Sequence, residues 1–274
     1  MNRNKTRVLV ESAIMVALAT VLSIFKIVEM PYGGSVTCAS MLPIVVLSYR
    51  HGVRYGMGAG LVYAVIQQLL GLKYLSYFTT PLSIVALILL DYLLAFCFVG
   101  LGGVFRKRIK SQSAALVLGA ALACFIRYLC HTVSGATVWA GLSIPDSAAI
   151  IYSLGYNATY MIPETTVLCA AAYYIGSVVD FTRELPERIA RPKEDKNRVG
   201  LYLLSGAMLL LAVVVDVALI APHTQDPETG KFDLGFLSEV SWVEVGVVTG
   251  VCVLVAVCSA LYARYKANKE EITE

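Results

Sequence analysis

Long apolar runs separated by short polar segments dominate the chain. Eight of these runs predict helices, at residues 8–28, 40–50, 52–71, 79–105, 113–136, 147–180, 199–221 and 240–264. A helix needs about 20 apolar residues to cross a bilayer, and most of the runs reach that length. The run at 40–50 is shorter, and we expect the long run at 147–180 to bend near Pro163, which lacks a backbone donor. The pattern predicts an all-α, multi-pass membrane protein.

Composition supports a membrane location. The 274 residues are 58% hydrophobic and only 15% charged, whereas a soluble domain is about 25% charged. The chain therefore has too few charges to cover a soluble surface. Its seven cysteines form no CxxC pair and lie mostly within apolar runs, which indicates helix packing rather than disulfides or a metal site. No cofactor is expected.

The distribution of basic residues predicts the topology. Of the 22 Lys and Arg residues, 18 lie in the two terminal segments and in alternate loops between the runs. Loops on the cytoplasmic side are enriched in Lys and Arg. We therefore expect eight crossings, with both termini in the cytoplasm.

One charged segment divides the chain. Residues 181–198 are rich in charges and contain two prolines, a composition typical of a linker. We expect a six-helix membrane domain at residues 1–182, a cytoplasmic linker at 183–198, and a two-helix transmembrane hairpin with a cytoplasmic tail at 199–274.

The most informative stretch runs from Arg127 to Asn157. Arg127, His131, Gly135 and Trp139 follow one another at four-residue spacing, which places them on one face of a helix. Polar groups are expensive in lipid and tend to mark functional positions. This face combines a cation, an imidazole, a glycine that allows close approach, and an indole. We therefore expect it to form the wall of a ligand pocket.

Further polar and aromatic residues fall on the same predicted side of the membrane. Aromatic faces with a carboxylate favour a flat cation, and Asn and His can hydrogen-bond the edge of a nitrogen heterocycle. These features predict one outward-facing site for a heteroaromatic cation. The residues are Gly33 and Gly34 in the first loop, Tyr74, Tyr77, Asp91, Tyr92, Tyr152, Asn157, Tyr160 and Glu164.

Structural interpretations of the same residues stay open. Asp91 could pair with Arg127 or hydrogen-bond between helices, and His131 could be a packing residue. Trp139 and the tyrosines could form an interfacial belt. Ser134, three residues after His131, is treated as a helix residue without a catalytic role. Small residues at four-residue spacing let helices pack closely; they are Gly52, Gly56 and Gly60, and Ala13 with Ala17.

The first 182 residues resemble a known family. Several motifs carry the resemblance: PYGGSVT and SMLPI in the first loop, RHG at 50–52, Asp91-Tyr92, the His131-Gly135-Trp139 spacing, and Tyr152 with Asn157. With them the chain resembles the thiamine-specific substrate-binding component (S-component) of energy-coupling factor (ECF) transporters. The resemblance implies a bacterial plasma-membrane protein that binds thiamine with high affinity from outside. It implies delivery together with a transmembrane T-component and two ATP-binding subunits.

The resemblance also implies roles for individual residues. The thiamine site would comprise Asp91, Tyr92, His131, Gly135, Trp139, Tyr152, Asn157, Tyr74 and Tyr63. The first loop, with Tyr32, Gly33 and Gly34, would act as a lid, and the Ala13/Ala17 face would contact the T-component. The chain departs from other members at three positions. Gly34 and Tyr63 stand where some members have tryptophan, and Asp91 stands where a glutamate can occur.

Two other function classes are alternatives to this interpretation of the sequence. A self-sufficient secondary transporter for an organic cation could couple to protons through Asp91 or His131. A membrane enzyme lacks support because no GxxxxGK[ST], HExxH or GxSxG motif occurs in the chain. The resemblance favours a transport subunit whose ATP hydrolysis is carried out by its partners.

Overall fold

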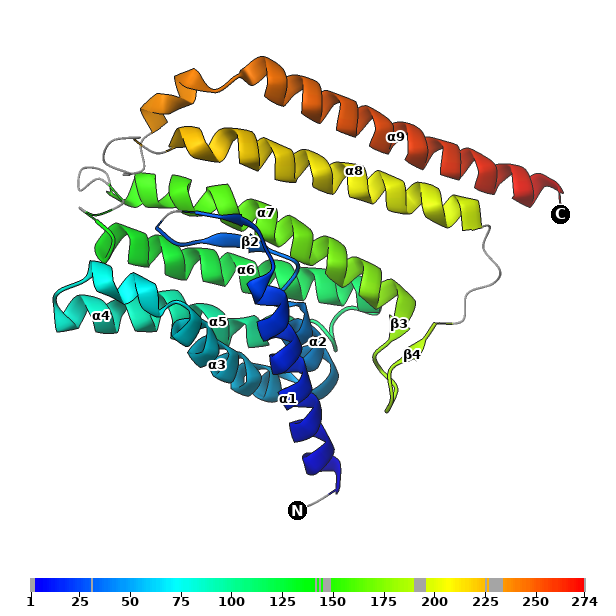
Figure 1. The fold of residues 1–274 in the computed structure, drawn as a ribbon. Helices are drawn as coiled ribbons and strands as arrows, with labels where there is room; N and C mark the ends of the chain where they lie inside the picture. The colour runs from blue at the N-terminus through cyan, green and yellow to red at the C-terminus, as the bar shows by residue number, and fades with distance from the viewer. Residues whose placement is uncertain are drawn as a thin grey trace. The chain divides into compact units, whose positions relative to one another are not determined.

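A computed structural model describes residues 3–30, 32–140, 142, 144, 149–189, 196–224, 226 and 234–273. Most of these residues are helical (Figure 1). Among the described residues, five helical segments are long and apolar enough to cross a membrane: Lys5–Ile24, Pro81–Gly103, Gln112–Thr137, Gly200–Ile220 and Trp242–Lys266. The predicted all-α membrane class is confirmed.

The described residues form two compact units, one built on Met1–Arg188 and the other on Ile189–Thr224 and Leu234–Glu274. The described residues of the first unit contain seven α-helices, one π-helix, two 3₁₀-helices and two short β-hairpins. Its elements are α1 (Arg3–Ile24), β1 (Lys26–Glu29), β2 (Ser35–Thr37), α2 (Leu42–His51), α3 (Val53–Leu70), η1 (Leu72–Tyr77), α4 (Pro81–Leu87), η2 (Ile88–Leu94), α5 (Ala95–Cys97), η3 (Phe98–Gly103), α6 (Gln112–Thr137), α7 (Ala149–Val178), β3 (Val179–Asp180) and β4 (Glu187–Arg188).

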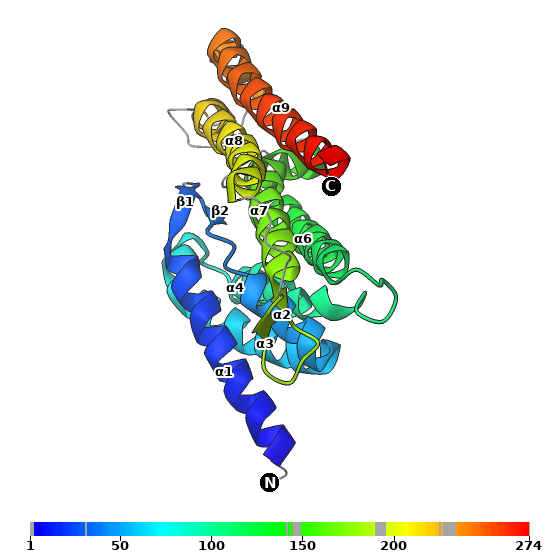
Figure 2. The same cartoon turned by 90° about the vertical axis from the view of Figure 1, so that its right-hand side faces the viewer.

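The predicted helix at 8–28 is wrong at its C-terminal end. Helix α1 stops at Ile24, and Lys26–Glu29 forms strand β1, which pairs antiparallel with β2. Gly33 and Gly34 have φ values of +106° and +89°, a region that glycine enters without steric cost. The chain can therefore reverse direction within a few residues. The apolar residues before the turn enter a hairpin, which caps the end of α1 (Figure 2).

The apolar run predicted at 79–105 is one helical segment with an irregular middle. After α4, residues Ile88–Leu94 form a π-helix, and after α5 residues Phe98–Gly103 form a 3₁₀-helix. π-Helical turns are rare and often occur at functional sites. This one carries Asp91 and Tyr92.

Glycines let the helices of the first unit approach closely. A Cβ on Gly60 would lie 2.8 Å from the Cys97 carbonyl oxygen, and one on Gly56 would lie 2.6 Å from the Gly100 oxygen. The packing interpretation of these two residues is therefore correct. Gly52 instead separates α2 from α3 with φ +94°, a value that favours glycine.

Helices α6 and α7 run side by side over much of their length (Figure 1). A Cβ on Gly135 would collide with the Ser153 hydroxyl oxygen, so a side chain at this position would clash with α7. Helix α7 continues through Pro163, which lies inside it.

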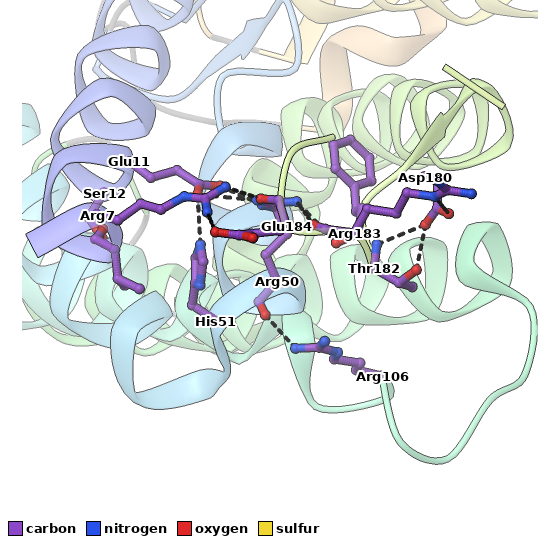
Figure 3. Close-up of polar contacts among 12 residues, drawn as sticks. Arg7, Glu11, Ser12, Arg50, His51, Arg106, Asp180, Thr182, Arg183 and Glu184 are labelled. Carbon is purple, nitrogen blue, oxygen red and sulfur yellow. Dashed lines mark hydrogen bonds and ion pairs between the residues drawn. The ribbon is translucent and has the colours of Figure 1, made fainter. Parts of the chain in front are cut away.

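A buried arginine ties four segments of the first unit together (Figure 3). The Arg50 guanidinium donates to both carboxylate oxygens of Glu11 on α1, and to the carbonyls of Phe181, Arg183 and Glu184 after α7. His51 also contacts the Glu11 carboxylate, and Arg106 donates to the Arg50 carbonyl. Glu184 additionally pairs with Arg7. We call this set of residues the Arg50 cluster.

The second unit is a helical hairpin. It comprises α8 (Lys196–Ile220), η4 (Ala221–Thr224), η5 (Leu234–Glu239) and α9 (Trp242–Thr273). The Ser205 hydroxyl donates to the Ala256 carbonyl at 2.8 Å, and the Thr249 hydroxyl lies 2.7 and 2.8 Å from the two Asp216 carboxylate oxygens. These two contacts link the helices at separate points along their length.

Candidate functional site

A cavity of about 460 Å³ lies within the first unit. It is bounded by the β1–β2 hairpin, the end of α1, α3, η1, the π-helix, α6 and α7. Its lining residues include Lys26, Glu29, Tyr32, Gly33, Gly34, Thr37, Tyr63, Tyr74, Asp91, Tyr92, Phe96, Arg127, His131, Gly135, Trp139, Tyr156, Asn157, Tyr160 and Glu164.

Asp91 organises one wall of the cavity. One of its carboxylate oxygens lies 2.8 Å from His131 Nδ1. The other accepts hydrogen bonds from the Ser134 hydroxyl at 2.7 Å and from Trp139 Nε1 at 2.9 Å. Three donors from one helix and the residues just after it thus fix the orientation of this carboxylate.

Arg127 lies beside His131 rather than Asp91. Its Nε donates to His131 Nε2 at 3.2 Å, and its guanidinium lies 4.4 Å from the Phe96 ring centre. A histidine that accepts at Nε2 and donates from Nδ1 is neutral. The proposed pairing of Asp91 with Arg127 is therefore wrong, because His131 occupies the position between them.

Asn157 forms a second polar centre on α7. Its amide nitrogen donates to the Ser153 and His131 carbonyls at 2.9 and 3.2 Å. Its amide oxygen accepts from the Tyr160 hydroxyl at 2.5 Å. This network ties α7 to α6 at the level of His131.

Aromatic rings surround Trp139. Its ring centre lies 4.9 Å from that of Phe78, 6.1 Å from Tyr77 and 6.5 Å from Tyr74. Trp139 is only 8% exposed, so it packs within the protein. An interfacial belt residue would instead present its ring to the lipid headgroups.

The β1–β2 hairpin and its turn, residues 26–37, border the cavity, and we call this segment the lid. On one side, Glu29 accepts from Lys26 at 2.8 Å, Lys73 at 3.1 Å and the Tyr74 hydroxyl at 3.3 Å. The Lys26 ammonium, and then that of Lys73, hold the pKa of Glu29 below its ordinary value. The other side of the lid contacts α7.

Of the twelve residues that the family resemblance implies for the site or lid, eleven line this cavity; they are Asp91, Tyr92, His131, Gly135, Trp139, Asn157, Tyr74, Tyr63, Tyr32, Gly33 and Gly34. The twelfth, Tyr152, is not among the lining residues, and Tyr156, one helical turn later, is. Ala13 and Ala17 lie on the exposed face of α1.

Sequence reasoning missed two contributors. Ser134, interpreted as a helix residue without a role, bonds the Asp91 carboxylate. Tyr156 donates to the Gly33 carbonyl of the lid at 2.8 Å. A signal for Tyr156 existed in the sequence, because it precedes Tyr160 and Glu164 at four-residue spacing.

The site has the character of a binding pocket. Within the part of the chain that the structure describes, no group of three or more His, Cys, Asp or Glu side chains could hold a metal ion. Ligand pockets commonly enclose about 300–1,000 Å³ and combine apolar walls with a few placed polar groups. The cavity falls within that range and has that composition.

Comparison with known proteins gives one consistent result. The family model described as thiamine transporter protein matches residues 9–180. Thiamine transporter ThiT of Bacillus subtilis (strain 168) is 35% identical over 182 residues, covering 62% of this chain and 90% of that protein. The structure of ThiT from Listeria monocytogenes superposes with a TM-score of 0.53 at 24% identity, covering 64% of this chain and 95% of that one.

The family match falls on the first unit, which contains the residues that line the cavity. Members of the family are named as transporters, which agrees with a transport protein and not an enzyme. A family model that covers residues 9–180 accounts for well over half of the chain. The chain therefore belongs to the thiamine transporter family.

Proposed function

We propose that this chain binds thiamine in the cavity beneath the lid and serves as the S-component of an ECF-type importer. It would capture the vitamin from outside the plasma membrane of a bacterium with both termini in the cytoplasm. The observation that carries the proposal is the Asp91 carboxylate, fixed by three donors beside the aromatic rings around Trp139.

Thiamine offers two features that this cavity can recognise. Its thiazolium ring is a flat cation, which aromatic faces attract with about 0.5–2 kcal/mol each. Trp139, Tyr74 and Tyr92 supply such faces, and Asp91 supplies the compensating negative charge. The aminopyrimidine ring presents hydrogen-bonding groups at its edge, and Asn157, which lines the cavity on α7 beside His131, supplies an amide group to meet it.

Energy for transport would come from partner proteins. The chain has no GxxxxGK[ST] motif, so two ATP-binding subunits and a T-component would drive delivery. The face of α1 that carries Ala13 and Ala17 is exposed, and small residues there would let a partner helix approach closely. This face is the proposed T-component contact.

Ligand titration tests the binding proposal. The chain has two tryptophans, Trp139 in the cavity and Trp242 in the second unit. A Trp242→Phe variant therefore makes Trp139 the sole tryptophan reporter. We expect thiamine to quench its fluorescence with high affinity, and riboflavin to have no effect. Thiamine phosphates in the same titration define how far the site tolerates substitution.

Three outcomes would contradict the proposal. Unchanged thiamine affinity in Asp91→Asn would place the ligand elsewhere, and so would unchanged affinity in Trp139→Phe measured by calorimetry. Thiamine uptake by proteoliposomes that hold this chain alone would replace the S-component assignment with a self-sufficient secondary transporter. Uptake that requires the ATP-binding partners supports the proposal.

A further inference from the structure

We propose that Tyr156, Tyr160 and Glu164 form a latch that holds the lid closed and sets how slowly the ligand leaves. The inference rests on the proposed function, because the ligand is taken to lie beneath the lid. The three residues are spaced by four along α7, so they form one stripe that faces the lid. Each contacts a different lid residue.

The contacts follow the lid in order. The Tyr156 hydroxyl donates to the Gly33 carbonyl at 2.8 Å. The Tyr160 ring lies against Gly34, where a Cβ would come within 2.5 Å of a ring carbon. The Glu164 carboxyl group accepts from the Thr37 amide at 2.5 Å and from the Thr37 hydroxyl at 2.8 Å.

Burial makes this side of the lid the stronger attachment. Tyr156, Tyr160 and Glu164 are 7%, 3% and 1% exposed. A buried amide or carboxyl group that loses its partner bears the full cost of desolvation. Opening the lid therefore separates Glu164 from two buried donors, unless water enters to replace them.

The opposite side of the lid is attached differently. Glu29 and Lys73 have side chains 40% and 64% exposed. Exposed ion pairs contribute little because water solvates the separated charges well. Breaking the Glu29 contacts is therefore easier than breaking those of Glu164, and the lid is expected to pivot open from the Glu29 side while α7 retains it.

Dissociation kinetics test the latch. Thiamine release is measured by stopped flow on the Trp242→Phe background. Glu164→Gln keeps one acceptor oxygen, and Glu164→Met keeps the length but no oxygen. We expect release to accelerate about 3-fold and about 10-fold or more in these two variants. Association should change much less, because lid retention acts after encounter.

A double-mutant cycle separates a direct contact from general damage. Thr37→Val removes the hydroxyl that donates a hydrogen bond to Glu164. The combined Glu164→Met/Thr37→Val variant is expected to release thiamine no faster than Glu164→Met alone. Thr166→Val on the exposed face of α7 is the matched control, since its hydroxyl bonds only within its own helix at Ile162. Additive effects, or unchanged release in Glu164→Met, would overturn the latch.

A ligand-free measurement keeps the latch separate from the proposed function. Amide hydrogen exchange at Thr37, measured without thiamine, should be faster in Glu164→Met than in the parent protein because the amide loses its acceptor. If exchange is faster in Glu164→Met but the parent protein does not bind thiamine, the proposed ligand is refuted and the latch is supported. Unchanged exchange with normal binding would refute the latch alone.

Discussion

At the residue scale, the site depends on how one carboxylate is held. Asp91 has no donor from its own segment among the contacts described; His131, Ser134 and Trp139 all belong to α6 or the residues after it. The hydrogen bonds therefore fix the position of α6 relative to the π-helix as well as the orientation of the Asp91 carboxylate. Substitutions in this set are expected to weaken ligand binding by misplacing Asp91, even where they do not touch the ligand.

Ser134→Ala tests that dependence. Removing one hydroxyl leaves Asp91 with two donors and a freer carboxylate. A hydrogen bond to a charged group contributes about 1.5–3 kcal/mol, of which only part is transmitted to the ligand. We expect thiamine affinity to fall about 3- to 10-fold in calorimetric titration. Ser177→Ala, which removes an exposed hydroxyl at the far end of α7, is the control; equal affinities in both variants would contradict the positioning role.

The exposed attachment of the lid predicts a pH effect. The pKa of Glu29 lies below its ordinary value of 4.5, chiefly because of Lys26. A lowered folded-state pKa means that the stabilisation is present above 4.5 and is lost as pH falls through the lowered value. Thiamine release should therefore accelerate in acid more steeply in the parent protein than in Glu29→Gln. Parallel pH profiles would show that Glu29 does not retain the lid.

Much of the site could be predicted at this scale, because helical spacing is visible in a sequence. His131, Gly135 and Trp139 repeat every four residues and do face the cavity. Ser134 could not be predicted in the same way. It sits one position from the repeat, and its role depends on Asp91, which lies 43 residues away along the chain.

At the element scale, the lid is the segment for which the apolar pattern gave a wrong prediction, a helix in place of a strand. Phe25, Ile27 and Val28 extend the hydrophobic run of α1, so periodicity favours a longer helix. The strand forms because the chain reverses at Gly33 and Gly34 and offers β2 as a partner. Strand pairing depends on the turn at Gly33 and Gly34, which lies outside the apolar run, so the composition of the run does not predict the strand.

The Arg50 cluster predicts a stability effect at the same scale. Arg50 is 6% exposed and holds α1 and the segment after α7 through one guanidinium. Arg50→Met leaves Glu11 and three carbonyls without this partner, and breaking a buried ion pair costs about 3–5 kcal/mol. We expect a clearly lower melting temperature in detergent. Arg54→Met, at a neighbouring exposed position, should melt like the parent, and equal losses would refute a special role for Arg50.

At the scale of the whole molecule, the relatives and the cavity share one unit. The family match ends at residue 180, and the cavity contains no residue beyond Glu164. The α8–α9 hairpin forms its own compact unit with contacts between its helices. The proposed ligand site therefore lies within the first unit.

Truncation after Arg188 tests this division. The shortened chain keeps the Arg50 cluster, the lid and every residue of the cavity. We expect its thiamine affinity to stay within about 2-fold of the full chain, measured through Trp139 fluorescence, because no lining residue is lost. A folded truncated protein that no longer binds thiamine would show that the hairpin contributes to the site.

The π-helix at Ile88–Leu94 has a consequence for how this segment can change. Each residue of an α-helix turns the chain by about 100°, so removing one leucine here would alter the phase between its two ends. Gly100 packs against Gly56 while Asp91 meets His131, and the π-helical turn sets the rotation between these two contacts. Such a deletion would leave hydropathy almost unchanged and the protein in the membrane. It would turn the binding carboxylate away from its pocket.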